Sequence, residues 1–446
     1  MKITIIGTGY VGLVSGVCLA AKGHDVICID KNISIVNKLN SGKLTIYEKD
    51  LENLLKLVIK KGKFTVTNDF YGSLSGAEVI MIAVGTPSVK GKINLDYIIE
   101  ATRKIGNYIA STNRFVTVIV KSTVIPGTTD TIIKKEIEKI SGKSLSEFGL
   151  GMNPEFLREG SAVNDFMFPD RIVLGFENSK TLKILEELYS SWSVDKIRVN
   201  SRTAELIKYA NNTILATQIS SINEIANFAT KIGNININKV VKAIKLDKRW
   251  NPIINKSRAN PDIIKYLEPG CGFGGSCFAK DLQAIISQGN HLGLPMKIMD
   301  AVLEVNKNQP LQVCKILESE FGELSGQNVL ILGLAFKPET DDARESPALK
   351  IAKNLINKGA KIFAHDPVAT KNFKSIFGIK SSKIKFIKKW SNYLKKVKII
   401  IIVTPWKEYY SLTNLKINNK VIFDTRSIFS ERYFPKSKYL TIGKII

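Results

Sequence analysis

Residues 272–281, GFGGSCFAKD, combine the residue types of a covalent active site. The thiol of Cys277 follows a run too rich in glycine to form a core, and Lys280 and Asp281 come three and four residues later. A helix that starts near Ser276 would place Cys277 at its N-terminus, where exposed N–H groups favour a thiolate, and Asp281 on the same face. The spacing indicates a nucleophile beside an acid–base group, with a buried cysteine before a helix cap as the alternative.

The segment NPEFLREG, residues 153–160, carries two carboxylates four residues apart, Glu155 and Glu159. It follows a short apolar strand, and two acids at a strand end are costly unless they are solvated or used. One of them could activate a water molecule by accepting its proton. A solvated turn is the alternative interpretation.

Residues 203–231 predict one long helix, because apolar side chains recur at helical spacing in a stretch with little glycine or proline. Lys208 and Asn212 share a face of this helix, and ordinary surface positions are the alternative for both. The helix is too long and too apolar to lie at the edge of one domain. We therefore expect it to link domains and to pack a dimer interface. Among the helices that follow, one is expected over residues 295–308.

The first 30 residues have the pattern of a dinucleotide-binding βαβ unit. A buried strand at 2–6 enters G-x-G-x-x-G at 7–12, a helix over 13–22 follows, and a strand at 25–29 ends at Asp30. The first glycine allows a tight turn, the second lets the backbone approach a pyrophosphate, and the third lets helix and strand pack closely. The Asp30 carboxylate would bind the ribose hydroxyls and repel a 2′-phosphate, so the expected cofactor is NAD.

More apolar strands are expected at 78–83, 115–120 and 149–152, each followed by polar or turn residues. Open parallel sheets bind ligands at this carboxyl edge. Thr86 and Thr123 are therefore candidates to line the cofactor cleft, with loop capping as the alternative.

A second α/β unit without a G-x-G-x-x-G motif begins near residue 327. The loop after its first strand, 328–333, contains Lys337 and Arg344, which are cations suited to phosphate. Its remaining elements are expected to be a helix and three strands, at 347–358, 361–364, 397–404 and 420–424. The predicted fold class is α/β, with two Rossmann-like doubly wound parallel-sheet domains joined by a central long-helix domain. The expected domain boundaries are 1–200, 201–310 and 311–446.

Composition excludes several other classes of protein. A chain of 446 residues with 44% hydrophobic content fits about three globular domains. The longest apolar run, 399–403, is too short to span a bilayer, and five cysteines without a paired framework favour free thiols in a reducing compartment. The net charge of +25 comes from scattered lysines, without a motif of a nucleic-acid reader. We expect a cytoplasmic protein with no nucleic-acid or membrane partner, whose basic surface suits an anionic substrate.

Eight segments, in order over nearly the whole chain, resemble the UDP-glucose/GDP-mannose dehydrogenase family. They are ITIIGTGYVGLVSG at 3–16, AVGTPS at 83–88, KSTVIPGT at 121–128, NPEFLREGSA at 153–162, ELIKYANN at 205–212, GFGGSCFAKD at 272–281, LGLAFKPETDDARESP at 332–347 and FDTR at 423–426. No single segment is specific to this family, but the eight segments together are.

The resemblance implies an NAD-dependent, four-electron oxidation of the sugar C6 alcohol to a carboxylate, with UDP-glucose as the expected substrate. Two NAD molecules in succession would take hydrides, and Cys277 would hold the aldehyde as a thiohemiacetal that becomes a thioester and is hydrolysed by water. A covalent hold suits this chemistry because it keeps the reactive aldehyde from escaping. GDP-mannose and UDP-N-acetylhexosamines are the alternative substrates within the family.

The resemblance also implies a role for each site residue. Lys208 would polarise the sugar oxygen, Asn212 would hold the oxyanion, Asp281 would act through an ordered water, and Glu155 would be the base for hydrolysis. Expected NAD contacts are Gly7, Gly9, Tyr10, Val11, Gly12, Asp30, Thr86, Thr123, Glu159, Lys280 and Arg344. Expected contacts with the UDP-sugar are Glu155, Phe156, Leu157, Arg158, Glu159, Lys208, Tyr266, Leu267, Glu268, Pro269, Gly270, Gly274, Lys337 and Arg426. No metal site is expected.

Two rival functions and one oligomer contact stay open at this point. A two-electron hydroxyacid dehydrogenase also joins a Rossmann domain to a long helix, but needs neither Cys277 nor the second α/β unit. A basic, anion-binding scaffold without activity is the other rival. A homodimer through the long helix is expected, and Arg258 is the nearest candidate for an arginine that relatives extend into the partner subunit's site.

Overall fold

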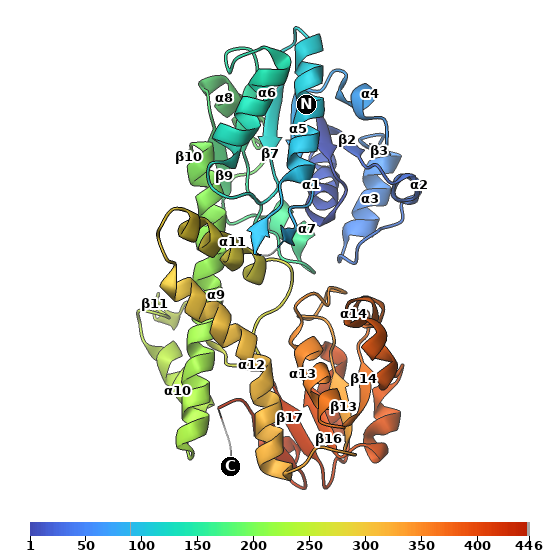
Figure 1. Ribbon diagram of the computed structural model, residues 1–446, viewed down its shortest axis with the longest axis vertical. Helices are drawn as coiled ribbons and strands as arrows, with labels where there is room; N and C mark the ends of the chain where they lie inside the picture. The colour runs from blue at the N-terminus through green and yellow to red at the C-terminus, as the bar shows by residue number, and fades with distance from the viewer. Residues whose placement is uncertain (90, 444–446) are drawn as a thin grey trace. The chain divides into compact units, whose positions relative to one another are not determined.

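The computed structural model describes residues 1–89 and 91–443, which fall into two compact units, Met1–Asn211 and Asn212–Ile446. The long helix α9, Ser201–Ile232, begins in the first unit and continues into the second (Figure 1). The predicted helix over 203–231 is therefore confirmed. The three domain boundaries stay predictions.

The first unit is built on an eight-stranded sheet in the order β10-β9-β8-β7-β4-β1-β2-β3. Its strands are β1 Lys2–Ile6, β2 Asp25–Ile29, β3 Phe64–Thr67, β4 Val79–Ile82, β7 Thr117–Val120, β8 Gly149–Met152, β9 Ile172–Phe176 and β10 Lys196–Val199. β8 and β9 pair antiparallel, whereas the other neighbours pair parallel. The chain winds outward from β1 in one direction and from β4 in the other. The carboxyl ends of β1 and β4 therefore border the switch point at which such sheets bind ligands.

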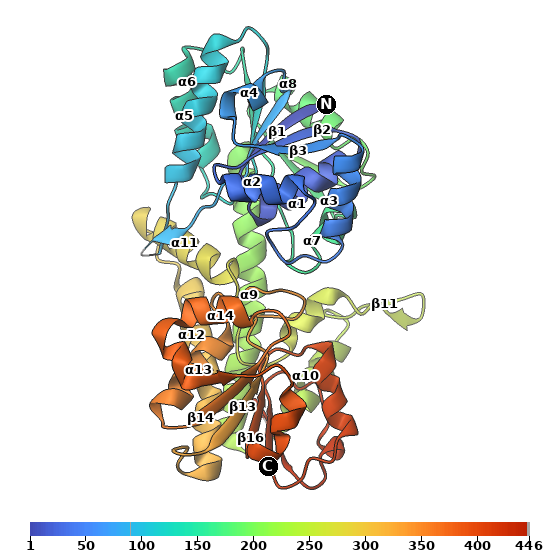
Figure 2. The ribbon, with the colours of Figure 1, turned by 90° about the vertical axis from the view of Figure 1, so that its right-hand side faces the viewer.

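Helices cover both faces of this sheet. They are α1 Tyr10–Ala21, α2 Ile33–Asn40, α3 Leu51–Lys60, α4 Phe70–Leu74, α5 Asp96–Ser111, α6 Lys134–Ser141, α7 Ala162–Met167 and α8 Ser179–Leu188. Val79 and Met81 of β4 join the core under α1, α3 and α8, and Ile80 and Ile82 join the core under α5 and α6. Figure 2 shows α5 and α6 on the opposite side of the strands from α1 and α3. The central strands β4, β7 and β8 are buried on both faces, as doubly wound parallel sheets require.

The second unit joins helices to a six-stranded parallel sheet in the order β15-β14-β13-β16-β17-β18. The strands are β13 Asn328–Leu332, β14 Lys361–His365, β15 Ile384–Phe386, β16 Ile399–Ile402, β17 Val421–Asp424 and β18 Lys438–Thr441. Its main helices are α10 Ile237–Leu246, α11 Phe278–His291, α12 Lys297–Phe321, α13 Pro347–Asn357 and α14 Thr370–Phe377. These two sheets and the long helix confirm the predicted fold class.

The helix predicted over 295–308 is longer than expected. Proline lacks a backbone N–H and usually ends or kinks a helix. α12 instead continues through Pro310 to Phe321, with Pro310 itself buried. Val313 and Leu317 lie in the main core of the second unit. Burial of this face stabilises the last turns despite the missing hydrogen bond.

Within residues 1–89 and 91–443, no helix has the length and hydrophobicity needed to cross a membrane.

A buried carboxylate ties the start of α9 to the loop after β7. The Glu205 carboxylate accepts hydrogen bonds from the backbone N–H groups of Gly127 and Thr129, at 2.6 and 2.8 Å. Burial raises the pKa of Glu205 to about 7. The folded protein therefore holds a proton on Glu205 at pH values where the unfolded chain has lost it.

This shift predicts a pH-dependent stability. The pKa of an unfolded glutamate is about 4.3, so between about pH 5 and 7 the folded state binds more protons than the unfolded state. The free energy of unfolding should fall as the pH rises through this range, by on the order of 3 kcal/mol from Glu205 alone. Glu205→Gln is uncharged at every pH and should lose this part of the decline. Urea unfolding at several pH values gives the free energy of unfolding of both proteins. The same dependence on pH in both would contradict the raised pKa of Glu205.

Candidate active site

The glycine turn between β1 and α1 has the geometry of a dinucleotide site. Gly7 has φ of +103°, and a Cβ added to Gly12 would lie 2.0 Å from the Gly7 carbonyl oxygen, so both positions require glycine. A Cβ added to Gly9 would meet none of the atoms that the structure describes within 4 Å. Gly9 caps α1, whose first residues are Tyr10 and Val11. The open side of the turn can therefore admit a pyrophosphate to a helix N-terminus.

Side chains at the neighbouring strand ends complete this cradle. Asp30 directly follows β2, and its carboxylate accepts hydrogen bonds from the Thr8 hydroxyl and from the Asn32 backbone N–H, at 2.9 Å for the latter. The Thr86 hydroxyl donates to the Thr123 carbonyl oxygen at 2.9 Å, which joins the loops after β4 and β7. Together the turn, the acid and these loops fit NAD.

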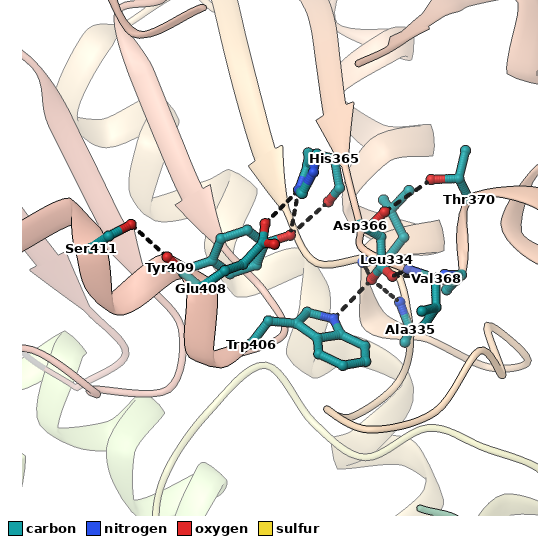
Figure 3. A network of polar contacts seen from close by, with 11 residues as sticks. Leu334, Ala335, His365, Asp366, Val368, Thr370, Trp406, Glu408, Tyr409 and Ser411 are labelled. Atoms are coloured by element: carbon teal, nitrogen blue, oxygen red, sulfur yellow. Dashed lines mark hydrogen bonds and ion pairs between the residues drawn. The ribbon is translucent and has the colours of Figure 1, made fainter. Parts of the chain in front are cut away.

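In the six-stranded sheet, the acid at the position that corresponds to Asp30 has a structural role. Asp366 follows β14 as Asp30 follows β2, but it is buried (Figure 3). Its two carboxylate oxygens accept five hydrogen bonds, from the backbone N–H groups of Leu334, Ala335, Val368 and Ala369 and from the indole N–H of Trp406. The side chain thus fixes the loop after β13 and has no remaining surface for a ribose.

Asp366→Ala should destabilise the protein strongly. The substitution leaves five donors buried without their acceptor, and disruption of a buried network around a charge costs about 3–5 kcal/mol. The measurement is the free energy of unfolding in urea. Asp262→Ala is the control, because Asp262 is an exposed acid paired with Lys265 and should change stability by less than about 1 kcal/mol. Equal effects from both substitutions would contradict the role of Asp366.

In the first unit, Glu155 and Lys208 form a buried ion pair. Lys208 Nζ lies 2.8 Å from Glu155 Oε1, and both side chains are less than a tenth exposed. The other carboxylate oxygen of Glu155 accepts the Leu157 N–H at 2.7 Å. Burial alone raises the pKa of Glu155, but the charge and hydrogen bond of Lys208 hold it below the usual value. Glu155 is therefore an ionised carboxylate able to accept a proton.

Residues 156, 158 and 159 each interact with a charged or polar group outside the 156–160 segment. Phe156 packs against two cations, with Lys208 Nζ 5.5 Å and the Arg171 guanidinium 3.8 Å from its ring centroid. Arg158 pairs with Asp165 at 2.6 Å. The pKa of the Tyr10 hydroxyl is raised, first by burial and then by Glu48. The charge of Glu159 makes a smaller contribution in the same direction.

Glu48 is a functional candidate that sequence reasoning missed. Its carboxylate accepts hydrogen bonds from the Tyr10 hydroxyl and from the backbone N–H groups of Gly160 and Ala162, the latter two at 2.6 and 2.8 Å. It thereby connects the glycine turn with the end of the NPEFLREG segment. An acid in a polar loop gives no signal of such burial in the sequence.

In the second unit, Cys277 lies at the N-terminus of α11 as predicted. Cys277 is the N-cap residue and is exposed, whereas the other four cysteines are buried free thiols. Asp281 lies one turn further and is 1% exposed. Its carboxylate accepts hydrogen bonds from Asn212 Nδ2 and Lys280 Nζ, both at 2.7 Å. The structure therefore brings Asn212, Lys280 and Asp281 together, and their roles in the reaction stay predictions.

The glycines before Cys277 pack against the loop after β13. The Gly275 N–H donates to the Arg344 carbonyl oxygen at 2.8 Å. A Cβ added to Gly274 would lie 2.5 Å from the Glu345 carbonyl oxygen, and one on Gly275 would lie 2.8 Å from the Phe336 ring. Larger residues would force the two loops apart and would displace the start of α11.

Three side-chain amides hold the backbone of Gly270 and Phe273, close before Cys277. Asn306 bonds both backbone groups of Phe273, at 2.8 Å to its N–H and 3.1 Å to its carbonyl oxygen. Asn223 accepts the Gly270 N–H and Gln309 donates to the Gly270 carbonyl oxygen, each at 2.8 Å. Sequence reasoning missed all three amides, because long helices show amphipathic spacing but not the target of a polar side chain.

Of the expected substrate residues of this unit, Arg426 contacts the glycine-rich segment directly. Arg426 donates to the Gly272 carbonyl oxygen at 3.0 Å, and Pro269 precedes the Gly270 anchor. A short 3-10 helix, Asp262–Leu267, carries Tyr266 and Leu267, and Glu268 pairs with Lys245.

The two expected phosphate-binding cations lie in the loop after β13. Lys337 Nζ lies 5.7 Å from the Phe336 ring centroid. The Arg344 guanidinium donates hydrogen bonds to both carboxylate oxygens of Asp342, and these bonds fix its orientation.

Arg258 belongs to a small hairpin, β11 Ile253–Ile254 with β12 Ser257–Arg258. It donates to the Asn251 carbonyl oxygen of the same hairpin at 2.8 Å. Its role in a partner subunit stays a prediction.

The site residues therefore form a cofactor cradle and a Glu155–Lys208 pair in the first unit, and a Cys277–Asp281–Asn212 group in the second. Three models of the UDP-glucose/GDP-mannose dehydrogenase family match the chain: the NAD binding domain at residues 1–193, the central domain at 202–308 and the UDP binding domain at 330–431. The chain belongs to this family of NAD-dependent oxidoreductases, as its eight motifs predicted.

Whole-length relatives agree with this assignment. A UDP-glucose 6-dehydrogenase of Rickettsia conorii is 38% identical over 455 residues, covering 100% of both chains. The structure of a UDP-glucose dehydrogenase from the hyperthermophilic archaeon Pyrobaculum islandicum matches with a TM-score of 0.89 and 36% identity, over 100% of this chain and 98% of the other. A UDP-D-ManNAc dehydrogenase from Pyrococcus horikoshii matches with a TM-score of 0.83 and 25% identity, over 100% and 99%.

Proposed function

We propose that this enzyme oxidises UDP-glucose to UDP-glucuronate at C6, with Cys277 as the covalent nucleophile. The observation that carries the proposal is the exposed Cys277 thiol at the N-terminus of α11, one turn before the buried Asp281. A helix N-terminus favours a thiolate, and a two-electron alcohol dehydrogenase has no use for one. The full-length similarity to enzymes named UDP-glucose dehydrogenase supports the choice of substrate.

The cofactor supplies the oxidant, as two NAD molecules in succession each accept a hydride from C6. In the first oxidation, Lys208 polarises the C6 oxygen, and a water molecule oriented by Asp281 takes the hydroxyl proton. The Cys277 thiolate then uses an electron pair of sulfur to form a bond to the aldehyde carbon. The π electrons of the C=O bond move onto the oxygen, where Lys208 and Asn212 stabilise the negative charge.

The second oxidation converts this thiohemiacetal to a thioester on Cys277. Glu155, ionised in the folded protein, takes a proton from the attacking water. The C–S bond then breaks, the electron pair returns to sulfur, and the carboxylate product leaves. Each of these roles follows the match of the residue to the family motifs.

The nucleotide part of the substrate is bound by cations and by the backbone of residues 266–270. Lys337 binds the diphosphate, Arg426 and the 266–270 backbone surround the sugar nucleotide, and Arg344 and Lys280 contact NAD. Charge-assisted hydrogen bonds from such cations suit phosphate oxygens. Since the thiol must stay reduced, we place the enzyme in the cytoplasm.

A homodimer through α9 is part of the proposal. Ile214, Ile225 and Ile232 are each about half exposed, and they recur at intervals of 11 and 7 residues on one stripe of α9. Phe228 flanks the stripe and is 67% exposed. Exposed apolar stripes of this kind mark protein interfaces.

The substrate assignment is tested with a panel of sugar nucleotides. kcat/KM with NAD is measured for UDP-glucose, UDP-N-acetylglucosamine, UDP-N-acetylmannosamine and GDP-mannose. We expect UDP-glucose to exceed each of the others by at least about tenfold, which is about 1.4 kcal/mol of discrimination. A preference for UDP-N-acetylmannosamine would favour the function named for the Pyrococcus horikoshii relative.

A further inference from the structure

Lys121 is a buried lysine to which sequence reasoning gave no role. It directly follows β7, and Asn153 directly follows the neighbouring β8, so the parallel pairing of Val120 with Met152 brings the two residues together. Lys121 Nζ donates to Asn153 Oδ1 at 2.6 Å, and its side chain is 5% exposed. The ammonium is thus held by an amide oxygen.

The same amide oxygen already has an uncharged donor. The Tyr189 hydroxyl donates to Asn153 Oδ1 at 2.5 Å, and the amide nitrogen of Asn153 donates to the Val173 carbonyl oxygen at 2.8 Å. The turn that leads from Asn153 to Glu155 is therefore anchored without Lys121. Burial of a charge is costly, so a merely structural role does not require an ammonium at this position.

Two charged groups act on Lys121, and both belong to the proposed reaction. Burial lowers the pKa of Lys121 to about 8, Glu155 opposes this shift, and Lys208 adds to it. Glu155 and Lys208 are bonded to each other at 2.8 Å. The cluster therefore contains two buried cations and one buried anion. Two further groups beside Lys121 carry no charge: the Tyr189 hydroxyl, which donates to the same Asn153 oxygen, and the Phe166 ring, whose centroid lies 5.6 Å from Nζ.

We propose that Lys121 is a positioning residue whose ammonium sets the charge state of the Glu155–Lys208 pair. This inference rests on the proposed function, because it concerns the base and the polarising cation of that reaction. A positive charge beside the pair favours the ionised form of Glu155 and disfavours the ionised form of Lys208. Without it, both groups hold their protons to higher pH.

The test is the pH dependence of kcat/KM for UDP-glucose in wild type, Lys121→Met, Lys121→Gln and Lys121→Arg. For the Met and Gln variants we expect the acid limb of the pH profile, where Lys121 is charged in wild type, to move to higher pH by roughly half a unit to one unit, which lowers the rate on that limb about three- to tenfold. Lys121→Arg keeps the charge and should keep the wild-type acid limb. Tyr189→Phe is the matched control, because it removes the uncharged donor to the same oxygen and should move neither limb.

A second readout does not depend on activity. Because the pKa of Lys121 is lower in the folded state than the usual lysine value of about 10.4, the unfolded state binds more protons between about pH 8 and 10. The stability of wild type relative to Lys121→Met should therefore rise with pH over this range.

Several outcomes would overturn the inference. An acid limb that stays in place in the Met and Gln variants, or that moves equally in Tyr189→Phe, would leave Lys121 with a packing role only. If the Met and Gln variants do not fold, a wild-type acid limb in Lys121→Arg supports the inference and a shifted acid limb overturns it. Absence of UDP-glucose oxidation by wild type would instead contradict the proposed function, before any variant is made.

Discussion

Cys277→Ala is expected to stop the enzyme before any UDP-glucuronate forms. Without the thiol, the aldehyde has no covalent attachment, and the second oxidation has no thiohemiacetal to act on. We expect the rate of UDP-glucuronate formation to fall by at least about 10³-fold, the scale of other lost nucleophiles. Binding of UDP-glucose should change little, because Cys277 is proposed to bond only to the aldehyde. Product is measured by chromatography and binding by calorimetry.

Cys271→Ala is the matched control for this result. Cys271 lies in the same stretch, six residues before Cys277, but it is fully buried with its Sγ 3.2 Å from the Thr425 hydroxyl. Its loss should cost about 1 kcal/mol of stability and leave product formation close to wild type. Undiminished product in Cys277→Ala, or equal losses in both variants, would remove Cys277 from the mechanism.

Lys208→Met is expected to reduce both stability and activity. The substitution leaves Glu155 buried without its 2.8 Å partner, which typically costs about 3–5 kcal/mol of unfolding free energy. Lys121 remains near Glu155 and should keep the loss from exceeding this range. The proposed loss of polarisation at the C6 oxygen should lower kcat by about 10²–10⁴-fold. Urea unfolding and steady-state kinetics measure the two effects separately.

A second substitution separates packing from chemistry. Lys208→Met with Glu155→Leu removes both charges of the pair and leaves Lys121 as the remaining buried cation, so part of the lost stability should return while activity stays absent. Lys104→Met is the control, because Lys104 and Glu100 form an exposed pair on α5 and their loss should cost less than about 1 kcal/mol. Recovery of activity in the double variant would contradict the roles proposed for Lys208 and Glu155.

The elements with strong periodicity were predictable from the sequence. The glycine turn, the first two strands and α9 were placed within a few residues, because each has a local pattern that its tertiary environment supports. Family membership, NAD and the oxidoreductase class were also predicted correctly from motif order. The position of Cys277 at the N-terminus of α11 agrees with the helix start near Ser276 that was considered from the sequence.

Other features depend on tertiary contacts that no local pattern contains. α12 continues through Pro310 because its last turns are buried in the core, and β8 pairs antiparallel with β9 although the surrounding sheet is parallel. Glu48 and Asp366 are buried acids whose hydrogen-bond donors come from distant segments. Asp366 in particular sits where a ribose-binding acid would be expected, and only its five hydrogen bonds reveal its structural role.

The ratio of NADH formed to UDP-glucose consumed tests the central claim most directly. Purified wild-type protein is given a limiting amount of UDP-glucose with excess NAD, NADH is counted by absorbance, and the sugar product is quantified in the same sample. Two NADH per UDP-glucose, with UDP-glucuronate as the product, is the result that a thioester on Cys277 predicts. One NADH per sugar, with an aldehyde as the end product, would contradict it.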